Sequence, residues 1–183
     1  MTWIGPATSR DRARLDRWCN AVGPVVADAV PSTLPPPADT LTVVAWNVHV
    51  GGGDLDRLID ALTRGELTGG TPTTSFVLLL QEAYRDGDDV PVRPPPGAKG
   101  PKVIREQPPQ GKRRSALDVA RARGLAIVYA PSMRNAGLLD ARLDVEDRGN
   151  AIVSAWPIAD PVAIELPFEG QRRVAVAATV SGR

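Results

Sequence analysis

The chain has 183 residues, of which 43% are hydrophobic and 23% are charged. This length and composition fit a single domain with a packed core, and they exclude a polypeptide that is disordered throughout. The 22 basic and 21 acidic residues give a net charge of +1, so the overall charge neither indicates nor excludes a polyanionic partner.

Cysteine content and hydropathy set further limits. Cys19 is the single cysteine, so no disulfide can form within the chain and an oxidising compartment is not indicated. The N-terminal residues lack the pattern of a secretory signal, and no uncharged apolar run approaches the ~20 residues that a membrane helix needs. We therefore expect a soluble, cytoplasmic protein with no membrane partner.

Residues 1–40 are predicted to form a helix and a proline-rich connector. Ser9 is expected to cap the helix, and Gly23-Pro24 to end it. The helix carries an apolar stripe made of Leu15, Trp18, Cys19 and Val22. Trp18 and Cys19 are expected to pack rather than to bind a ligand. The prolines between residues 31 and 37 are typical of a stiff connector, and we expect no chemistry from this part of the chain.

A strand, a helix and a second strand are predicted between residues 41 and 82. The apolar runs 41–46 and 76–80 indicate buried strands. Between them, Asp54 is placed to cap a helix with apolar residues at helical spacing, and Gly65 is placed to end it. A helical crossover makes the two strands parallel neighbours, so both end at the same edge of the sheet.

Asn47 and Glu82 each follow one of these apolar runs. Their side chains are therefore expected to meet at the carboxyl edge, where open α/β sheets bind their ligands. An amide oxygen beside a carboxylate suits a hard cation such as magnesium, which keeps several of its waters. One histidine and one cysteine exclude a tetrahedral zinc site built by this chain alone. The alternative interpretation is that Glu82 is a surface acid at a strand end and Asn47 a turn residue.

Residues 85–114 are predicted to form a long loop, because this stretch is rich in proline and glycine and has no apolar periodicity. Against one acid, Glu106, the second half of the loop carries the basic residues Lys99, Lys102, Arg105, Lys112, Arg113 and Arg114. Since the loop leaves the predicted metal edge, these charges are candidates for contacts with substrate phosphates. The alternative is a solvated loop without a partner.

One helix and four strands are predicted after this loop. Ser115 and Asp118 fit a capping box for a helix that ends near Gly124. The strands are expected at residues 125–130, 151–155, 161–166 and 172–180, with the last ones antiparallel and joined by short turns.

Three more polar residues are candidates for the site. Arg148 and Asn150 precede strand 151–155 and are placed to hold a phosphate or another oxygen near the metal, since arginine forks onto phosphate oxygens. A turn at Gly149 is the alternative. His49 shares a face with Asn47 if the first strand continues, and it is then placed to contact substrate. A purely structural hydrogen bond is the alternative for His49.

Three blocks of the sequence follow one another in a characteristic order. They are Thr42-Val-Val-Ala-Trp-Asn-Val-His49, Leu78-Leu-Leu-Gln-Glu-Ala83, and Arg148-Gly-Asn-Ala-Ile-Val-Ser154 with Pro157-Ile158. Together they resemble the endonuclease/exonuclease/phosphatase superfamily, the deoxyribonuclease-I-like hydrolases. The resemblance implies an α/β fold of the α+β type, namely part of a four-layer α/β/β/α sandwich with mixed sheets. It also implies that Asn47 and Glu82 lie in the active site and that Glu82 is a metal ligand, with magnesium as cofactor and manganese as the alternative.

The family's later motifs, a strand with a histidine, Gly-Asp-x-Asn and Ser-Asp-His, have no counterpart before Arg183. Residues 41–183 therefore resemble the first half to two thirds of the family's domain, and we expect the C-terminal strands and the catalytic histidine to be missing.

Two functions remain open at this point, so whether the chain is an enzyme is undecided. One is a magnesium-dependent phosphoester hydrolase of the nuclease or phosphodiesterase type. The other is a truncated module that is inactive, or that binds a partner as a homo-oligomer or with a complementing chain. Members of the family act on DNA, RNA, inositol phosphates and sphingomyelin, and the basic loop favours nucleic acid here.

Overall fold

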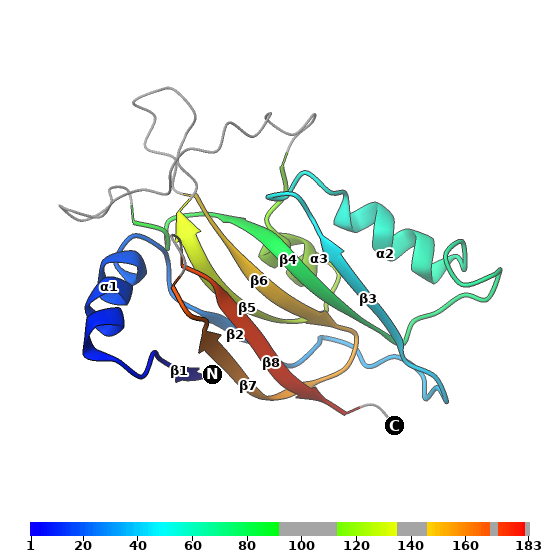
Figure 1. Ribbon diagram of the computed structural model, residues 1–183. Helices are drawn as coiled ribbons and strands as arrows, with labels where there is room; N and C mark the ends of the chain where they lie inside the picture. The colour runs from blue at the N-terminus through cyan, green and yellow to red at the C-terminus, as the bar shows by residue number, and fades with distance from the viewer. Residues whose placement is uncertain (92–112, 135–145, 169–171, 182–183) are drawn as a thin grey trace.

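The computed structural model describes residues 1–91, 113–134, 146–168 and 172–181. These residues form two sheets and three helices (Figure 1). The larger sheet has the strand order β2-β5-β6-β4-β3 and the smaller sheet the order β1-β7-β8. The larger sheet contains β2 (Val26–Asp28), β3 (Thr42–Asn47), β4 (Phe76–Asp86), β5 (Ala126–Arg134) and β6 (Glu146–Ser154). The smaller sheet contains β1 (Thr2–Ile4), β7 (Ile158–Glu165) and β8 (Val174–Val180). The helices are α1 (Ser9–Cys19), α2 (Leu55–Thr63) and α3 (Ala116–Ala122).

The larger sheet is covered on both faces. On one face, α2 and α3 pack against the sheet and share the main hydrophobic core with it, through side chains such as Ile59, Leu78 and Leu117. On the other face, the smaller sheet contributes Ile158 and Val176 to a second cluster with Val77, Ala126, Val128 and Ile152 of the larger one. Helix α1 lies at one side of the molecule, near β1 (Figure 1). Each sheet combines parallel and antiparallel pairs, so the predicted α/β class with two mixed sheets is confirmed.

The predicted strand-helix-strand unit is confirmed in detail. Strands β3 and β4 are parallel, with a register that runs from Thr42 opposite Phe76 to Asn47 opposite Gln81. Asp54 caps α2, because its side chain accepts a hydrogen bond from the backbone N–H of Arg57 at 2.9 Å. Gly65 follows the helix with a φ of 79°, a left-handed conformation that glycine adopts without steric cost. The predicted antiparallel pairing of β7 and β8 is also observed.

Several local expectations were wrong. Strands β1 and β2 lie in the N-terminal segment that was expected to hold only a helix and a connector, and each joins a different sheet. Thr8, not Ser9, caps α1, since its side chain accepts from the backbone N–H of Asp11. Ser115 stands at the N-cap position of α3, but its side chain makes no capping hydrogen bond. Among the described residues, no helix is long and apolar enough to cross a membrane.

Candidate active site

A β-bulge interrupts β4 at Gln81 and Glu82. Leu80 is the register partner of Ala151 and Ala83 that of Gly149, so two residues of β4 lie opposite Asn150 alone. Leu80 and Ala83 are both buried in the core beneath the helices. Because a bulge accommodates one extra residue without reversing the strand's faces beyond it, Gln81 and Glu82 both turn to the opposite face, toward the side of the smaller sheet.

Glu82 has an unusual backbone conformation. Its φ of 53° lies in the left-handed region, which favours glycine and is costly for other residues. Its side chain is half-buried. Such local strain is characteristic of functional sites, where the surrounding structure holds a residue in an unfavourable geometry.

Asn47 reaches the same face from the neighbouring strand. Trp46 packs against the helix-side core, and alternation along β3 then directs Asn47 to the other side of the sheet. Asn47 is the register partner of Gln81 and its side chain is exposed. Strand pairing therefore places Asn47 beside Gln81, the residue before Glu82, at the carboxyl end of β3. That Asn47 and Glu82 form one site stays a prediction.

Asn150 and Arg148 come from β6 and also share this face. Ile152, two residues after Asn150, packs toward the smaller sheet, so alternation places Asn150 and Arg148 on the same side. The side-chain Nδ2 of Asn150 donates a hydrogen bond to the backbone carbonyl of Val174 at 2.6 Å. This hydrogen bond connects β6 to β8. It uses the amide nitrogen of Asn150 and not its amide oxygen. Arg148 is half-buried.

The structure corrects the predicted position of three residues. Glu82 is not at a strand end, because β4 continues beyond the bulge to Asp86. Arg148 and Asn150 lie within β6, so the alternative of a turn at Gly149 is wrong.

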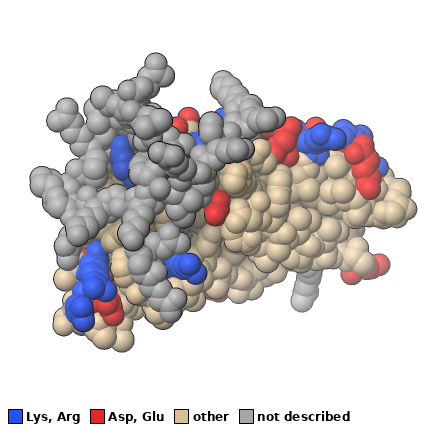
Figure 2. Space-filling view, turned by 45° about the horizontal axis from the view of Figure 1, so that its top comes forward, with Lys and Arg blue, Asp and Glu red and all other residues tan. Residues whose placement is uncertain are grey.

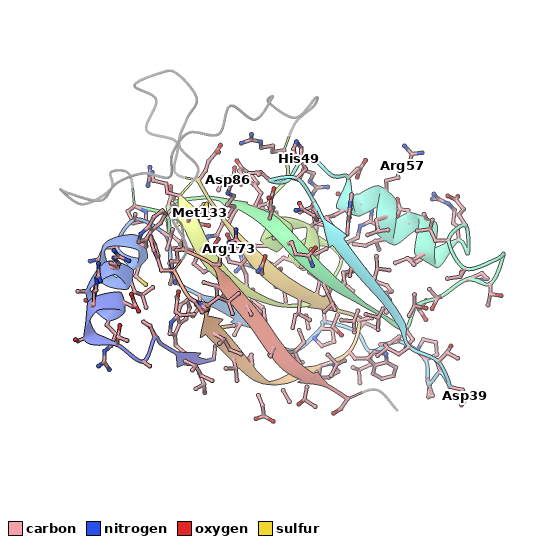
Figure 3. The ribbon with its side chains drawn as sticks, in the orientation of Figure 1. Asp39, His49, Arg57, Asp86, Met133 and Arg173 are labelled. Atoms are coloured by element: carbon pink, nitrogen blue, oxygen red, sulfur yellow. The ribbon has the colours of Figure 1, made fainter. Side chains whose placement is uncertain are left out.

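The prediction that β3 continues to His49 is also wrong. The strand ends at Asn47, and His49 has a φ of 50° in the turn that follows. The backbone N–H of His49 donates to the Oδ1 of Asn47 at 2.9 Å, so Asn47 does have the turn role that was its alternative interpretation. The exposed side chain of His49 stands at the end of β3, on the same edge as Asp86 at the end of β4 (Figure 3).

The sequence did not predict a role for Gln81. The bulge brings its side chain to the same face as Asn47, where its amide is exposed and its Nε2 donates to the backbone carbonyl of Leu79 at 3.3 Å. The sequence offers no signal for the bulge, because residues 76–80 are all apolar and show no alternation that a bulge could interrupt.

The predicted loop 85–114 begins too early, because β4 runs to Asp86. Of the basic residues in its second half, the structure describes Arg113 and Arg114, and both are paired with acids. Arg113 lies 3.3 Å from Glu146 and its guanidinium lies over the ring of Tyr84. Arg114 pairs with Asp56. On the face seen in Figure 2, basic and acidic side chains of the described residues lie next to one another. Lys99, Lys102, Arg105, Glu106 and Lys112 lie outside the described residues.

Tyr84, two residues after Glu82, contacts both members of the Arg113–Glu146 ion pair. Its hydroxyl donates to Glu146 at 2.8 Å, and its ring leaves no room for a side chain at Gly51, whose Cβ would stand 2.6 Å from the Cβ of Tyr84. Burial, followed by the hydrogen bond to Glu146, raises the pKa of Tyr84 far above its usual value. The hydroxyl of Tyr84 therefore stays protonated above the pH at which an exposed tyrosine ionises.

The donors on the shared face are oxygens: the carboxylate of Glu82 and the amide oxygens of Asn47, Gln81 and Asn150. Hard oxygen donors with one carboxylate fit Mg²⁺, which is usually bound by one or two carboxylates and keeps several waters. In the described part of the chain, no group of three or more His, Cys, Asp or Glu residues is placed to hold a metal. Two hollows of about 360 and 280 Å³ lie elsewhere, beside α1, and share Leu15 and Arg172.

Comparison with protein-family models and with curated protein sequences gives no match. Two solved structures are similar to the chain. One is an endonuclease/exonuclease/phosphatase family protein from Leptotrichia buccalis, at 14% identity and a TM-score of 0.44, over 77% of this chain and 50% of that one. The other is an endonuclease/exonuclease/phosphatase from Beutenbergia cavernae, at 22% identity and a TM-score of 0.44, over 75% of this chain and 33% of that one. The chain thus spans half of the length of the first and a third of the second.

Proposed function

We propose that the chain belongs to the endonuclease/exonuclease/phosphatase superfamily and carries the metal-binding side of an active site that hydrolyses phosphoesters, with magnesium as the cofactor and nucleic acid as the substrate. One observation carries this proposal: a bulge with a strained, left-handed Glu82 brings a carboxylate to the face of Asn47 at the carboxyl end of a parallel strand pair. The three sequence blocks support it, because each contributes a residue to that face.

The residues of this face have different roles in the proposed site. Glu82 supplies the anionic ligand, and the amide oxygens of Asn47 and Gln81 orient water or a phosphate oxygen beside it. Arg148, two residues from Asn150 on β6, is placed to fork onto phosphate oxygens. Bound magnesium supplies the charge that polarises the phosphoryl group and stabilises the leaving oxygen.

A cytoplasmic location stays a prediction from the cysteine content.

A cleavage assay tests this function. The purified chain is incubated with single- and double-stranded DNA, RNA and bis-(p-nitrophenyl) phosphate, with Mg²⁺ or with EDTA. For each substrate that the chain cleaves, we expect EDTA to abolish the cleavage and Glu82→Gln to lower its rate by at least about 100-fold. Glu66→Gln is the matched control, since Glu66 is an exposed acid that pairs with Arg64 just beyond the C-terminal end of α2, and it should retain full activity. Metal-dependent cleavage that is equal in wild type and Glu82→Gln would refute the assignment.

A second candidate, a module that depends on a partner, is favoured by an apolar surface next to the site. Val43 of β3 is 56% exposed and Leu41 is 45% exposed, whereas the smaller sheet lies across β5 and β6. Strand β8 is an edge strand of seven residues without a charge or a proline. Edge strands of this kind readily pair with another chain. Light scattering distinguishes this candidate: it predicts self-association of the purified chain, which Val43→Glu weakens, and a stable monomer contradicts it.

A further inference from the structure

A buried ion pair joins β4 to β6 immediately beyond the bulge. The side chains of Arg85 and Asp147 are only 2% and 0% exposed, and the two residues are direct register partners. The contact is bidentate: Nε of Arg85 donates to Oδ1 of Asp147 at 3.0 Å, and Nη2 donates to Oδ2. Arg85 lies three positions after Glu82.

The pair is enclosed by residues from other segments. Asp147 also accepts a hydrogen bond from the hydroxyl of Tyr129 at 2.7 Å and one from the backbone N–H of Gly23 at 2.8 Å. Arg85 donates through Nη1 to the backbone carbonyl of Pro24 at 2.7 Å and lies over the ring of Tyr129. The residues that follow α1 therefore close the pair off from water.

Stability alone does not account for such a pair. Removing two charges from water is costly, and replacing a buried ion pair by apolar residues of similar size is often neutral or stabilising. A bidentate pair, in contrast, has one acceptable geometry. We therefore expect the pair to contribute mainly by fixing the alignment of β4 with β6.

Alignment is a particular problem at this point of the sheet. Strand β6 faces a bulge in β4 between Leu80 and Ala83, and a second irregularity in β5 between Pro131 and Met133. Near these irregularities, regular strand pairing thus fixes the alignment of β6 neither with β4 nor with β5. A shift by one residue turns every side chain to the other face, which would move the carboxylate of Glu82 away from Asn47.

We propose that Arg85 and Asp147 are positioning residues that lock the register of β4 on β6 and thereby hold Glu82 on the face of Asn47. This inference depends on the proposed function of Glu82 as the metal ligand. Arg85 and Asp147 act through the backbone of β4 and do not touch the metal or the substrate.

The chain offers a matched control. Arg172 and Glu165 form a second buried, bidentate pair, with side chains that are 2% and 4% exposed. That pair belongs to the smaller sheet, where Glu165 ends β7 and Arg172 precedes β8. It has the same chemistry and burial as the first pair, and its hydrogen bonds do not involve β4 or the bulge at Gln81 and Glu82, although Nη1 of Arg172 also donates to the backbone carbonyl of Ser132 in β5 at 3.4 Å.

The test replaces each pair by apolar residues, as Arg85→Met/Asp147→Leu and as Arg172→Met/Glu165→Leu. Three quantities are measured: the urea midpoint, the Mn²⁺ affinity by electron paramagnetic resonance, and hydrogen exchange of the amides of residues 80–86. We expect the first double variant to have a lower midpoint, because the Tyr129 hydroxyl and the Gly23 N–H lose their acceptor, to lose at least about 10-fold in Mn²⁺ affinity, and to exchange faster at the bulge. The control variant should match wild type in affinity and in exchange at these residues.

Arg85→Lys decides the question if the double variant does not fold, because lysine keeps the charge but cannot form the bidentate contact. It should weaken Mn²⁺ binding several-fold and speed exchange at residues 80–86. Wild-type affinity and exchange in a folded variant of this pair would overturn the proposal. If wild type itself binds no Mn²⁺, the proposed function fails, and the exchange measurement alone then decides whether the pair locks the register.

Discussion

Leu80 and Ala83 lie three residues apart in β4, yet both side chains are buried in the core beneath α2 and α3. In a regular strand, residues three positions apart face opposite sides of the sheet. The bulge between them absorbs one residue, and Glu82 adopts a left-handed backbone conformation to do so. The strain at Glu82 is therefore the structural consequence of bringing its carboxylate to the face of Asn47.

Replacing Glu82 by glycine should separate stability from function. Glycine adopts a φ of 53° without steric cost, so Glu82→Gly should raise the free energy of unfolding by about 1 kcal/mol. The same variant should lose metal binding, because the carboxylate is removed. Urea unfolding checks the first effect, with Glu82→Gln as a control that keeps the strain. A clear loss of stability in Glu82→Gly would show that the left-handed conformation is not strained.

Gly149 should not tolerate even a methyl group. A Cβ at this position would lie 2.0 Å from the backbone oxygen of Ala130 and 2.7 Å from the Cα of Pro131. Because these are backbone atoms of the neighbouring strand, they cannot move without breaking the pairing of β5 with β6. We expect Gly149→Ala to lose more than about 2 kcal/mol in the free energy of unfolding. Gly5→Ala is the control, since its Cβ would meet nothing within 4 Å; equal stability of the two variants would contradict this account.

Asp54 should stabilise α2 through its cap. Its carboxylate accepts the N–H of Arg57, so Asp54→Ala should cost about 0.5–2 kcal/mol, whereas Asp54→Asn should keep most of the stability. Thermal unfolding of the three proteins provides the measurement. If alanine and asparagine are equally destabilising, the side-chain cap does not contribute.

Stability should fall steeply above pH 10 because of Tyr129. Burial, followed by the negative charge of Asp147, raises the pKa of Tyr129 well above its ordinary value of about 10. Below that pH, the hydroxyl is protonated in the folded and unfolded states alike, so it causes no pH dependence. Above it, only the unfolded chain loses the proton, and the free energy of unfolding should decrease by up to about 1.4 kcal/mol per pH unit.

Urea unfolding between pH 8 and pH 11 measures this slope, and Tyr129→Phe should make it shallower. Tyr84, whose pKa is also raised by burial, adds a similar slope that remains in the variant. Identical slopes in wild type and Tyr129→Phe would show that Tyr129 does not titrate differently in the two states.

The elements that could be predicted from the sequence are those whose signals are local. The apolar runs of β3 and β4, the cap at Asp54 and the glycine at Gly65 determine the crossover by short-range chemistry, and all four are confirmed. Strands β1 and β2 have three residues each and no clear periodicity. Only their pairing with β7 and β5 makes them strands, so they could not be predicted from a local pattern.

The candidate site could likewise be predicted only in the part that depends on local signals. The pairing of Asn47 with Gln81, the residue before Glu82, follows from the parallel crossover. The bulge that sets the direction of Glu82 depends on how β4 pairs with β6. Register partners in these strands, such as Arg85 and Asp147, are 62 residues apart in the sequence, so no local sequence pattern predicts their pairing. For this reason the roles of Gln81 and of the Arg85–Asp147 pair appear only in the structure.

The most direct test of the central claim is a Mn²⁺ titration of wild type and Glu82→Gln, followed by electron paramagnetic resonance at equal protein concentration. The account predicts one site in wild type, competition by Mg²⁺, and at least about 10-fold weaker binding in Glu82→Gln with an unchanged fold. Equal binding by the two proteins, or no binding by wild type, would contradict the claim that Glu82 anchors a metal.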